Sequence, residues 1–222
     1  MKNAARAAPR TWWLTFFFSL AIAGYSASVI LRGDQSFPRE LHDSFVARPW
    51  GIYPHAFFGA LALLTGPFQF RRALLLRRRW LHRLIGRVYI IAALATGLAG
   101  LYMSVYSYGG LTTHLGFGAL GLLTATTTAF AYQRIRSHDV AAHREWMIRS
   151  FALIFAAVTL RIELPLLMVA NRGAFTPSYA IVAWLCWVPN IIWAEWYIRF
   201  ARGRPAAIVP SHSAAIAPAT VH

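Results

Sequence analysis

The sequence is poor in cysteine and in charge. Its 222 residues include one cysteine, Cys186, which excludes an internal disulfide and a thiolate metal cluster within the chain. Charged residues make up 13% of the sequence, whereas soluble domains carry about 25%. Acidic residues are scarcest, with 7 Asp and Glu against 22 Lys and Arg. A soluble domain of useful size is therefore not expected.

Long apolar runs take up most of the chain. Hydrophobic residues amount to 58% and the mean hydropathy is +0.47. A helix needs about 20 mostly apolar residues to cross a bilayer core about 30 Å thick. We therefore predict an all-α, polytopic integral membrane protein whose single domain, residues 11–200, has six transmembrane helices. The predicted helices cover residues 11–31, 51–70, 84–106, 112–133, 147–170 and 177–198.

The two ends of the chain have a different composition. Residues 1–10 are expected to form a cytoplasmic N-terminus. The apolar run that follows has about 20 residues, longer than the 7–15 of a signal-peptide core, and predicts an uncleaved first helix. Residues 201–222 are rich in Ala, Pro and Ser, which is typical of a disordered tail.

The basic residues are unevenly distributed. Of the 22 Lys and Arg, 17 fall at the N-terminus, after helices two and four, at the starts of helices three and five, and in the tail. Cytoplasmic loops carry such an excess, so we predict a bacterial inner-membrane protein with both termini in the cytoplasm. The arginine runs at residues 71–72 and 77–79 would face anionic lipid. Nucleic acid explains this pattern less well, despite a formal net charge of +15, and is not expected as a partner.

A helical hairpin appears twice. HAFFGALALLT, starting at His55, and HLGFGALGLLT, starting at His114, are identical at 8 of 11 positions. HRLIGRVY, starting at His82, likewise matches HREWMIRSF, starting at His143, if one gap is allowed. The repeat units are residues 51–106 and 112–170. A parallel repeat of this kind predicts a duplicated four-helix core with a pseudo-two-fold axis along the membrane normal.

The four histidines take equivalent positions in the two units. Helices two and four run from outside to inside, so His55 and His114 are predicted at one depth near the outer surface. Helices three and five run back, so His82 and His143 are predicted together at the inner surface. In one four-helix bundle the histidines would form two facing pairs.

A stripe of small residues follows each outer histidine. Residues at this spacing share one face of a helix. Small side chains let a flat or bulky group approach the backbone, or let two helices pack closely. The stripes are Gly59, Ala62 and Gly66 after His55, and Gly118, Gly121 and Ala125 after His114.

Paired histidines inside a bundle suggest haem b, because imidazole is a good ligand for haem iron. The hypothesis is one or two bis-histidine haems that carry electrons across the membrane, with donor and acceptor unknown. In the alternative, purely structural interpretation, the histidines form hydrogen bonds at helix ends and the stripes pack helices. Arginines beside the inner pair would neutralise the haem propionates. These arginines are Arg83, Arg87, Arg144 and Arg149.

This arrangement resembles the two-haem, six-helix transmembrane cytochrome b family, which moves electrons from ascorbate to ferric iron or monodehydroascorbate. The resemblance is architectural and covers roughly residues 51–170. It implies that the ligands pair helix two with helix four and helix three with helix five. The pairs here would be His55 with His114 and His82 with His143.

A closer resemblance in sequence rests on three motifs. They are GPFQF at residues 66–70, HRLIGRVY at residues 82–89 and HREWMIRSFALIFAAVTLR at residues 143–161. These motifs resemble a bacterial family of predicted membrane proteins, domain of unknown function 2306. The resemblance covers most of the chain and implies a membrane fold without naming an activity.

Transport or proton transfer is a second class of function. Arg161 and Glu163 fall in the outer half of helix five, and ionisable residues inside a span are functional candidates. They are two positions apart and do not share a helix face, so Arg161 needs another partner. Gln69, His55 and His114 are candidates, and a solvated cavity is an equal alternative. No helix is predicted to be broken in corresponding halves, which counts against a transporter.

Two further alternatives stay open. Two histidines are fewer than the three or four protein ligands that Zn²⁺ usually takes, but Glu40, His42 and Asp43 in the outer loop offer additional ligands to the outer pair. A membrane scaffold would perform no chemistry at all. It predicts that the outer histidines can be replaced without loss of function.

Overall fold

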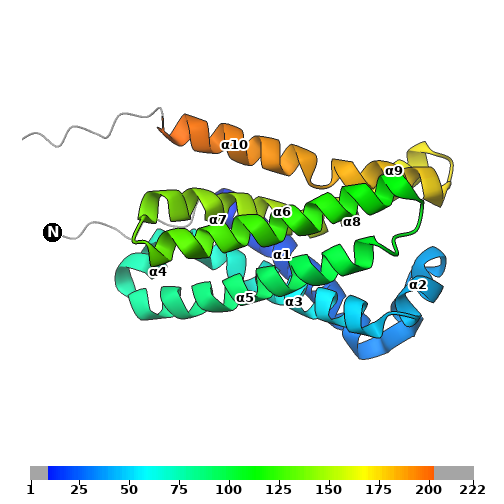
Figure 1. The fold of residues 1–222 in the computed structure, drawn as a ribbon, viewed down its shortest axis with the longest axis horizontal. Helices are drawn as coiled ribbons and strands as arrows, with labels where there is room; N and C mark the ends of the chain where they lie inside the picture. Colours follow the sequence, from blue (N-terminus) through cyan, green and yellow to red (C-terminus); the bar gives the residue numbers. More distant parts are fainter. Residues whose placement is uncertain (1–9, 203–222) are drawn as a thin grey trace, which may run out of the picture.

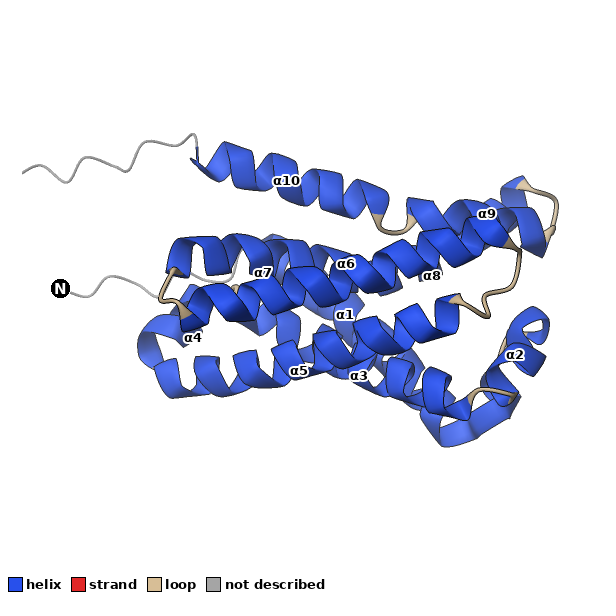
Figure 2. Ribbon diagram, viewed as in Figure 1, coloured by secondary structure: helices blue, strands red, loops and turns tan. Residues whose placement is uncertain are grey.

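The computed structural model describes residues 10–202, and all regular secondary structure in that part is helical (Figure 1, Figure 2). Most of the expected N-terminal segment and of the expected disordered tail lies outside these residues. The short elements are η1 (Gly33–Ser36), η2 (Arg39–Leu41), α2 (His42–Val46) and α4 (Arg72–Arg77). The longer helices are α1 (Arg10–Arg32), α3 (Pro49–Gln69), α5 (Arg79–Ser104), α6 (Leu111–Arg136), α7 (Val140–Ile154), α8 (Ala156–Ala170), α9 (Phe175–Leu185) and α10 (Val188–Arg202).

Five helical stretches within residues 10–202 are long and apolar enough to cross a membrane. This confirms the prediction of a multi-pass, all-α membrane protein. The stretches are Arg10–Ser36, Arg79–Ser104, Leu111–Arg136, Val140–Ala170 and Phe175–Phe200.

Helix α3, which corresponds to the second of the six predicted spans, is not among these five stretches. It has 21 residues but includes Pro54, His55, Pro67 and Gln69, which lower its apolar character. Nevertheless α3 packs along α5 inside the helix assembly.

Four helix segments form a ring at the centre of the protein. Helix α3 packs on α5, α5 on α6, α6 on α7, and α7 touches α3. This order places α3 diagonally opposite α6, and α5 diagonally opposite α7. Outside the ring, α1 packs on α3, α9 on α6 and α8, and α10 on α7 (Figure 1). The four predicted histidine-bearing segments therefore surround a common core.

Large side chains and a polar network fill this core. Tyr89 of α5 is fully buried and packs near Phe151 of α7. The Tyr89 hydroxyl lies 2.8 Å from Ser150 Oγ, which in turn lies 2.7 Å from Thr128 Oγ1 of α6. Because buried polar groups need hydrogen-bond partners, this network fixes the relative positions of α5, α6 and α7.

The small-residue stripes bring helices together. A Cβ atom added to Gly121 of α6 would lie 2.7 Å from the backbone nitrogen of Leu101 and 2.9 Å from the carbonyl oxygen of Gly97, both in α5. A Cβ atom at Gly66 of α3 would collide with the ring of Phe151. At these positions the stripes serve close helix packing.

Two of the predicted spans are broken near their middles. The fifth is interrupted at Phe155, between α7 and α8, and the sixth at Cys186 and Trp187, between α9 and α10. Pro189 explains the second break, since proline lacks the N–H that would bond to the carbonyl of Leu185. These breaks lie in adjacent helices and not in corresponding positions of the two repeat units, so they do not contradict the expectation of no broken helix in corresponding halves.

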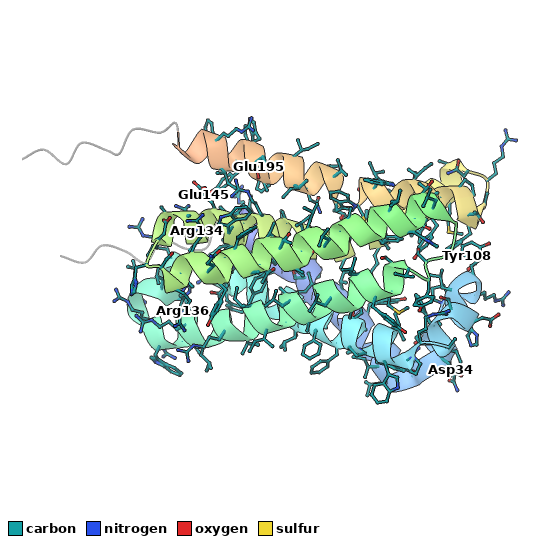
Figure 3. The ribbon with its side chains drawn as sticks, viewed as in Figure 1. Asp34, Tyr108, Arg134, Arg136, Glu145 and Glu195 are labelled. Carbon is teal, nitrogen blue, oxygen red and sulfur yellow. The ribbon has the colours of Figure 1, made fainter. Side chains whose placement is uncertain are left out.

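The two ends of the bundle differ in charge. Arg134 and Arg136 lie at the end where α6 turns into α7, while Asp34 and Tyr108 lie at the opposite end (Figure 3). The connection between α3 and α5 contains the short basic helix α4, Arg72–Arg77, at the first of these ends. Helix α5 starts at Arg79 and α7 at Val140, so the basic residues expected at the membrane edge form the first turns of long helices.

Candidate functional site

The inner histidines are brought together at the basic end of the ring. His82 in the first turns of α5 and His143 in the first turns of α7 lie close enough to interact electrostatically. His143 Nδ1 lies 2.8 Å from the carbonyl oxygen of Ala131 in α6. Since only a protonated nitrogen donates to a carbonyl, this bond fixes the tautomer and leaves His143 Nε2 free.

Two unsatisfied polar atoms lie beside this pair. His82 Nδ1 and Gln69 Nε2 are buried and have no hydrogen-bond partner in the described part of the chain. Gln69 faces Gly86, one turn after His82, where an added Cβ would lie 2.9 Å from Gln69 Oε1. Buried polar groups without partners are rare and often mark a site completed by a ligand or water.

The arginines around the inner pair divide into two groups. Arg83, Arg87 and Arg144 are exposed at the basic end, where they are free to meet an anion. Arg149 is engaged, because its Nε lies 2.5 Å from Glu195 Oε1 and its Nη2 lies 3.1 Å from Glu195 Oε2. The expectation that Arg149 neutralises a propionate is therefore wrong, since this arginine joins α7 to α10.

The outer histidines are not brought together. His55 Nδ1 lies 3.1 Å from the carbonyl oxygen of Thr96 in α5, whereas His114 Nε2 lies 2.7 Å from the carbonyl oxygen of Ser107 in the α5–α6 connection. Thr96 and Ser107 are 11 positions apart in the sequence. His114 thus lies more than two helical turns nearer the outer end than His55, since one turn rises about 5.4 Å. The expected common depth of this pair is not observed.

The side chain of His55 is exposed although it lies on the packed face of α3. Gly51, Ala62 and Gly66 share this face at helical spacing, and all three are buried. Phe57, on the opposite face, is 52% exposed, as expected for a residue that meets lipid. His55 therefore lies where α3 faces α5, and a Cβ atom added to Gly100 of α5 would lie 3.2 Å from its Cε1 and Nδ1 atoms.

Arg161 of α8 lies within electrostatic reach of His55. Its Nη1 donates to the carbonyl oxygen of Ala157 at 2.9 Å, and its Cζ lies 4.8 Å from the ring centroid of Tyr25. His55 and Tyr179 are within electrostatic reach of the guanidinium. Arg161 Nε is buried without a hydrogen-bond partner among residues 10–202. Of the three predicted partners of Arg161, only His55 lies within electrostatic reach of it. His114 bonds to Ser107, and Gln69 lies beside Gly86.

Glu163 does not neutralise Arg161. No ion pair joins the two within the described residues, and Glu163 Oε2 is buried there without a hydrogen-bond partner. Glu163 lies instead near Cys186, at the break between α9 and α10. The spacing argument from the sequence, that residues two apart take different faces, agrees with this placement.

A polar cluster joins the two helix breaks and was not predicted. Thr159 Oγ1 donates to the carbonyl oxygen of Cys186, and Asn190 Nδ2 donates to the carbonyl oxygen of Ala152 at 3.2 Å. The Val-Pro-Asn sequence at residues 188–190 is the signal that was available. A proline in the middle of a span frees a carbonyl, and a neighbouring amide is suited to bond there.

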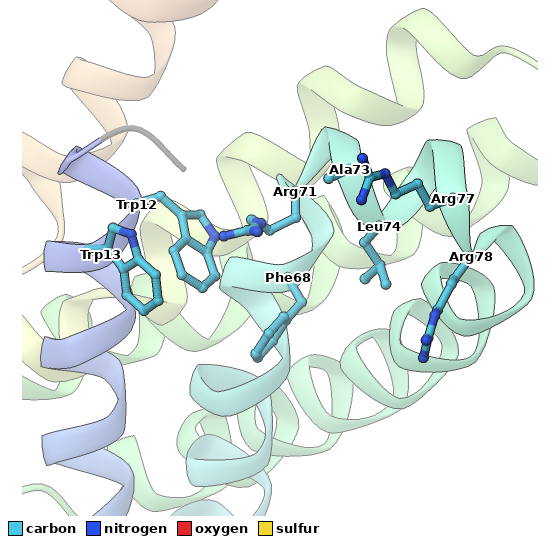
Figure 4. A pocket seen from close by; sticks show the side chains of 8 residues that line it. All are labelled: Trp12, Trp13, Phe68, Arg71, Ala73, Leu74, Arg77 and Arg78. Atoms are coloured by element: carbon cyan, nitrogen blue, oxygen red, sulfur yellow. The ribbon is translucent and has the colours of Figure 1, made fainter. Parts of the chain in front are cut away.

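A shallow cavity opens at the basic end, between α1, the end of α3 and α4 (Figure 4). Its volume is about 390 Å³. The Arg71 guanidinium lies 4.5 Å from the ring centroid of Trp12, and Trp12 Nε1 donates to the carbonyl oxygen of Pro67 at 2.8 Å. The lining residues are Trp12, Trp13, Phe68, Arg71, Ala73, Leu74, Arg77 and Arg78.

A conventional metal site is not assembled in the described part of the chain. Residues 10–202 contain no group of three or more His, Cys, Asp or Glu side chains arranged to hold a metal ion. His42 Nδ1 lies 3.2 Å from Asp43 Oδ1 in the outer loop. The alternative in which this loop supplies extra ligands to the outer histidines is therefore wrong.

Comparison with known proteins agrees with the membrane architecture. A model of the family described as "Predicted membrane protein (DUF2306)" matches residues 52–198. The match contains the four ring helices, both inner histidines and Arg161. No curated protein and no solved structure matches the chain.

Proposed function

Because the chain belongs to the DUF2306 family of predicted membrane proteins, a membrane function is the premise, and we propose that it binds haem b between His82 and His143 and transfers electrons. The observation that carries the proposal is the approach of these two imidazoles from diagonally opposite helices, α5 and α7. Haem sites in helical bundles take their axial ligands from facing helices in this way.

The proposed topology has six spans. The ring is complete only with α3, whose 21 residues extend about 32 Å at 1.5 Å per residue, enough for a bilayer core. The basic end would face the cytoplasm of a bacterium, together with both termini, according to the positive-inside rule. The hairpins that contain α3 with α5 and α6 with α7 and α8 are the proposed duplicated units.

The residues of the inner pair fit a bis-histidine haem. The bond from His143 Nδ1 to the carbonyl oxygen of Ala131 orients the ring and leaves Nε2 as the nitrogen that would bind haem iron. His82 is half-buried and its Nδ1 lacks a partner in the described chain. Arg83, Arg87 and Arg144 offer exposed guanidinium groups to the propionates.

The residues of the outer pair do not fit. His114 uses Nε2 in its bond to Ser107, and His55 lies too deep to face it. The proposal is therefore one haem per chain at the basic end, and the second haem expected from the repeat is not proposed again.

Each residue has a defined task in this proposal. When bound, haem b supplies reversible one-electron chemistry. His82 and His143 would hold it between α5 and α7, and the Ala131 carbonyl oxygen orients the His143 ring. The Tyr89–Ser150–Thr128 network keeps the three helices that surround the site at fixed distances. The electron donor and acceptor are not identified by these residues.

The test is an absorption spectrum of the detergent-purified protein expressed with haem in supply. The oxidised and dithionite-reduced forms are compared, and haem is quantified after pyridine extraction. We expect a sharp reduced α-band and about one haem per chain. Substitutions His82→Ala and His143→Ala should each abolish haem binding, while His114→Ala, the matched control, should retain it.

Three results would contradict the proposal. A colourless, folded protein would exclude haem. Two haems per chain would show that the outer histidines are also ligands. Loss of haem in His114→Ala but not in His82→Ala would show that haem binds at the outer end of the bundle and not at the basic end.

Transport of a small solute or proton is the second candidate, and the two broken helices favour it. Interrupted spans commonly form substrate sites near the bilayer midplane. The breaks here lie in neighbouring helices, and Arg161 lies six residues beyond Phe155. A colourless protein that moves a solute or protons in sealed vesicles, and that loses this activity in Arg161→Gln, would favour transport over electron transfer.

Anionic lipid is the proposed partner at the basic end. The cavity of Figure 4 combines two tryptophans with three arginines, a composition typical of the membrane interface. Native mass spectrometry in mixed lipid should show preferential retention of anionic over zwitterionic phospholipid. Arg71→Gln should reduce this preference, whereas Arg172→Gln, an exposed arginine at the opposite end, should leave it unchanged.

A further inference from the structure

One buried cation lacks a counterion in the described chain, and we propose that it binds a small carboxylate-bearing molecule. Arg161 lies in a membrane-spanning helix, where an unpaired charge is costly. No carboxylate of residues 10–202 forms an ion pair with it. Its Nε is shielded and has no hydrogen-bond partner there. The guanidinium is therefore incomplete without an external anion.

The free edge of the guanidinium selects the kind of anion. Nη1 is held by the carbonyl oxygen of Ala157 at 2.9 Å, the only hydrogen bond of this side chain in the described residues. The edge formed by Nε and Nη2 is left for a ligand. Guanidinium binds carboxylates through two parallel N–H···O bonds, so two coplanar oxygens match this edge better than a spherical ion does.

One aromatic ring lies against this guanidinium. Tyr25 of α1 has its ring centroid 4.8 Å from Cζ. Tyr179 of α9 and His55 of α3 are within electrostatic reach. Because aromatic rings stack face to face with an offset or edge to face, the Tyr25 ring favours a flat ligand. A planar, conjugated or aromatic carboxylate is therefore the expected class.

His55 offers a second polar contact. Its imidazole lies on the face of α3 that packs against α5, where a Cβ added to Gly100 would lie 3.2 Å from its Cε1 and Nδ1 atoms, and it is within electrostatic reach of Arg161. The Nδ1 atom is occupied by Thr96, at 3.1 Å from the carbonyl oxygen, which leaves Nε2 for a ligand atom. In this proposal His55 contacts a ligand, whereas its counterpart in the repeat, His114, forms a hydrogen bond to Ser107.

The experiment measures binding of radiolabelled benzoate to the full chain in nanodiscs of uncharged lipid, by equilibrium dialysis. Benzamide, which has the same shape without the charge, is the control ligand. Arg161→Gln removes the charge. Arg161→Lys keeps the charge but cannot form the two parallel N–H···O bonds of a guanidinium. Arg172→Gln removes an exposed arginine of the outer loop and is the matched control.

We expect saturable binding of one benzoate per chain and none of benzamide. Arg161→Gln should weaken binding about tenfold or more, because it removes the charge-assisted hydrogen bonds to the carboxylate. Arg161→Lys should give an intermediate affinity, and Arg172→Gln the wild-type affinity. If Arg161→Gln does not fold, His55→Phe, which removes the Nε2 contact, should weaken binding instead.

The proposal is overturned if folded wild-type protein binds no benzoate saturably, if benzamide binds equally well, or if a folded Arg161→Gln variant keeps the full affinity. This inference does not depend on the haem proposal, because equilibrium dialysis measures bound benzoate whether or not the protein contains haem. A colourless protein that binds benzoate would reject the electron-transfer proposal and keep this one. A haem protein without benzoate binding would do the reverse.

Discussion

The side-chain amide of Asn190 in α10 donates a hydrogen bond to the carbonyl oxygen of Ala152 in α7 at 3.2 Å. The same amide nitrogen lies 3.0 Å from the carbonyl oxygen of Cys186 and 3.3 Å from Thr159 Oγ1. Asn190 therefore joins the two broken spans at the level of their breaks. In an apolar environment, such a bridge satisfies carbonyls that a continuous helix would bond internally.

Replacement of Asn190 by Ala should destabilise the protein. Loss of this bridge leaves buried acceptors unpaired, at a cost of about 1–3 kcal/mol. Thermal unfolding in detergent, followed by circular dichroism, should show a lower midpoint. Thr126→Val is the control, because Thr126 bonds only within its own helix and is not part of the bridge. Equal shifts in both variants would show that Asn190 has no special role.

Two glycine substitutions should have opposite effects. Gly121→Ala places a methyl group against the α5 backbone, 2.7 Å from the Leu101 nitrogen, so α5 and α6 must separate. Gly24→Ala meets nothing within 4 Å and should stabilise α1 by about 1 kcal/mol through helix propensity. Unfolding midpoints of the two variants should therefore move in opposite directions. A tolerated Gly121→Ala would show that the stripe leaves room for a bulky group.

The helix content and the membrane location could be predicted from the sequence because both follow from local composition. Apolar runs of about 20 residues determine spans wherever the chain places them. Helix α3 shows the limit of this rule, because Pro54 and Gln69 reduce its hydropathy while its contacts with α5 hold it in the bundle. Whether α3 belongs to the bundle depends on its packing against other helices, and an average of hydropathy along the sequence does not include that packing.

The candidate site was predictable only in part. The repeat predicts His82 near His143, and the two lie within electrostatic reach of each other because each is in the first turns of a helix that starts at the same end of the bundle. It failed for His55 and His114, since the two hairpins are not superimposable in depth and each histidine bonds to a different part of α5 and its loop. A sequence repeat determines the order of residues along each helix. The depth of a residue in the bundle also depends on how far one helix is shifted along its neighbour, and contacts such as that between Gly97 and Gly121 determine this shift.

The ion pair between Arg149 and Glu195 should hold α10 against α7. Its side chains are 15% and 36% exposed, and both guanidinium contacts to Glu195 are within 3.1 Å. Arg149→Glu or Glu195→Arg alone should expose the connection between α9 and α10 to limited proteolysis. The double exchange should restore part of the protection, with a coupling energy of about 0.5–3 kcal/mol. Identical cleavage of single and double variants would exclude a direct contribution of this pair.

Variants of the hydrogen-bond network of Tyr89, Ser150 and Thr128 should change the stability of the protein without changing its haem content. Tyr89→Phe removes the hydroxyl that bonds to Ser150 but leaves the bond between Ser150 and Thr128, so about 1 kcal/mol of stability should be lost. Ser150→Ala removes both bonds and should cost more. Neither residue touches the inner histidines by hydrogen bond within the described chain, so the haem content per folded molecule should equal that of the wild type. If Tyr89→Phe instead reduced haem content while the unfolding midpoint stayed unchanged, Tyr89 would belong to the cofactor site itself.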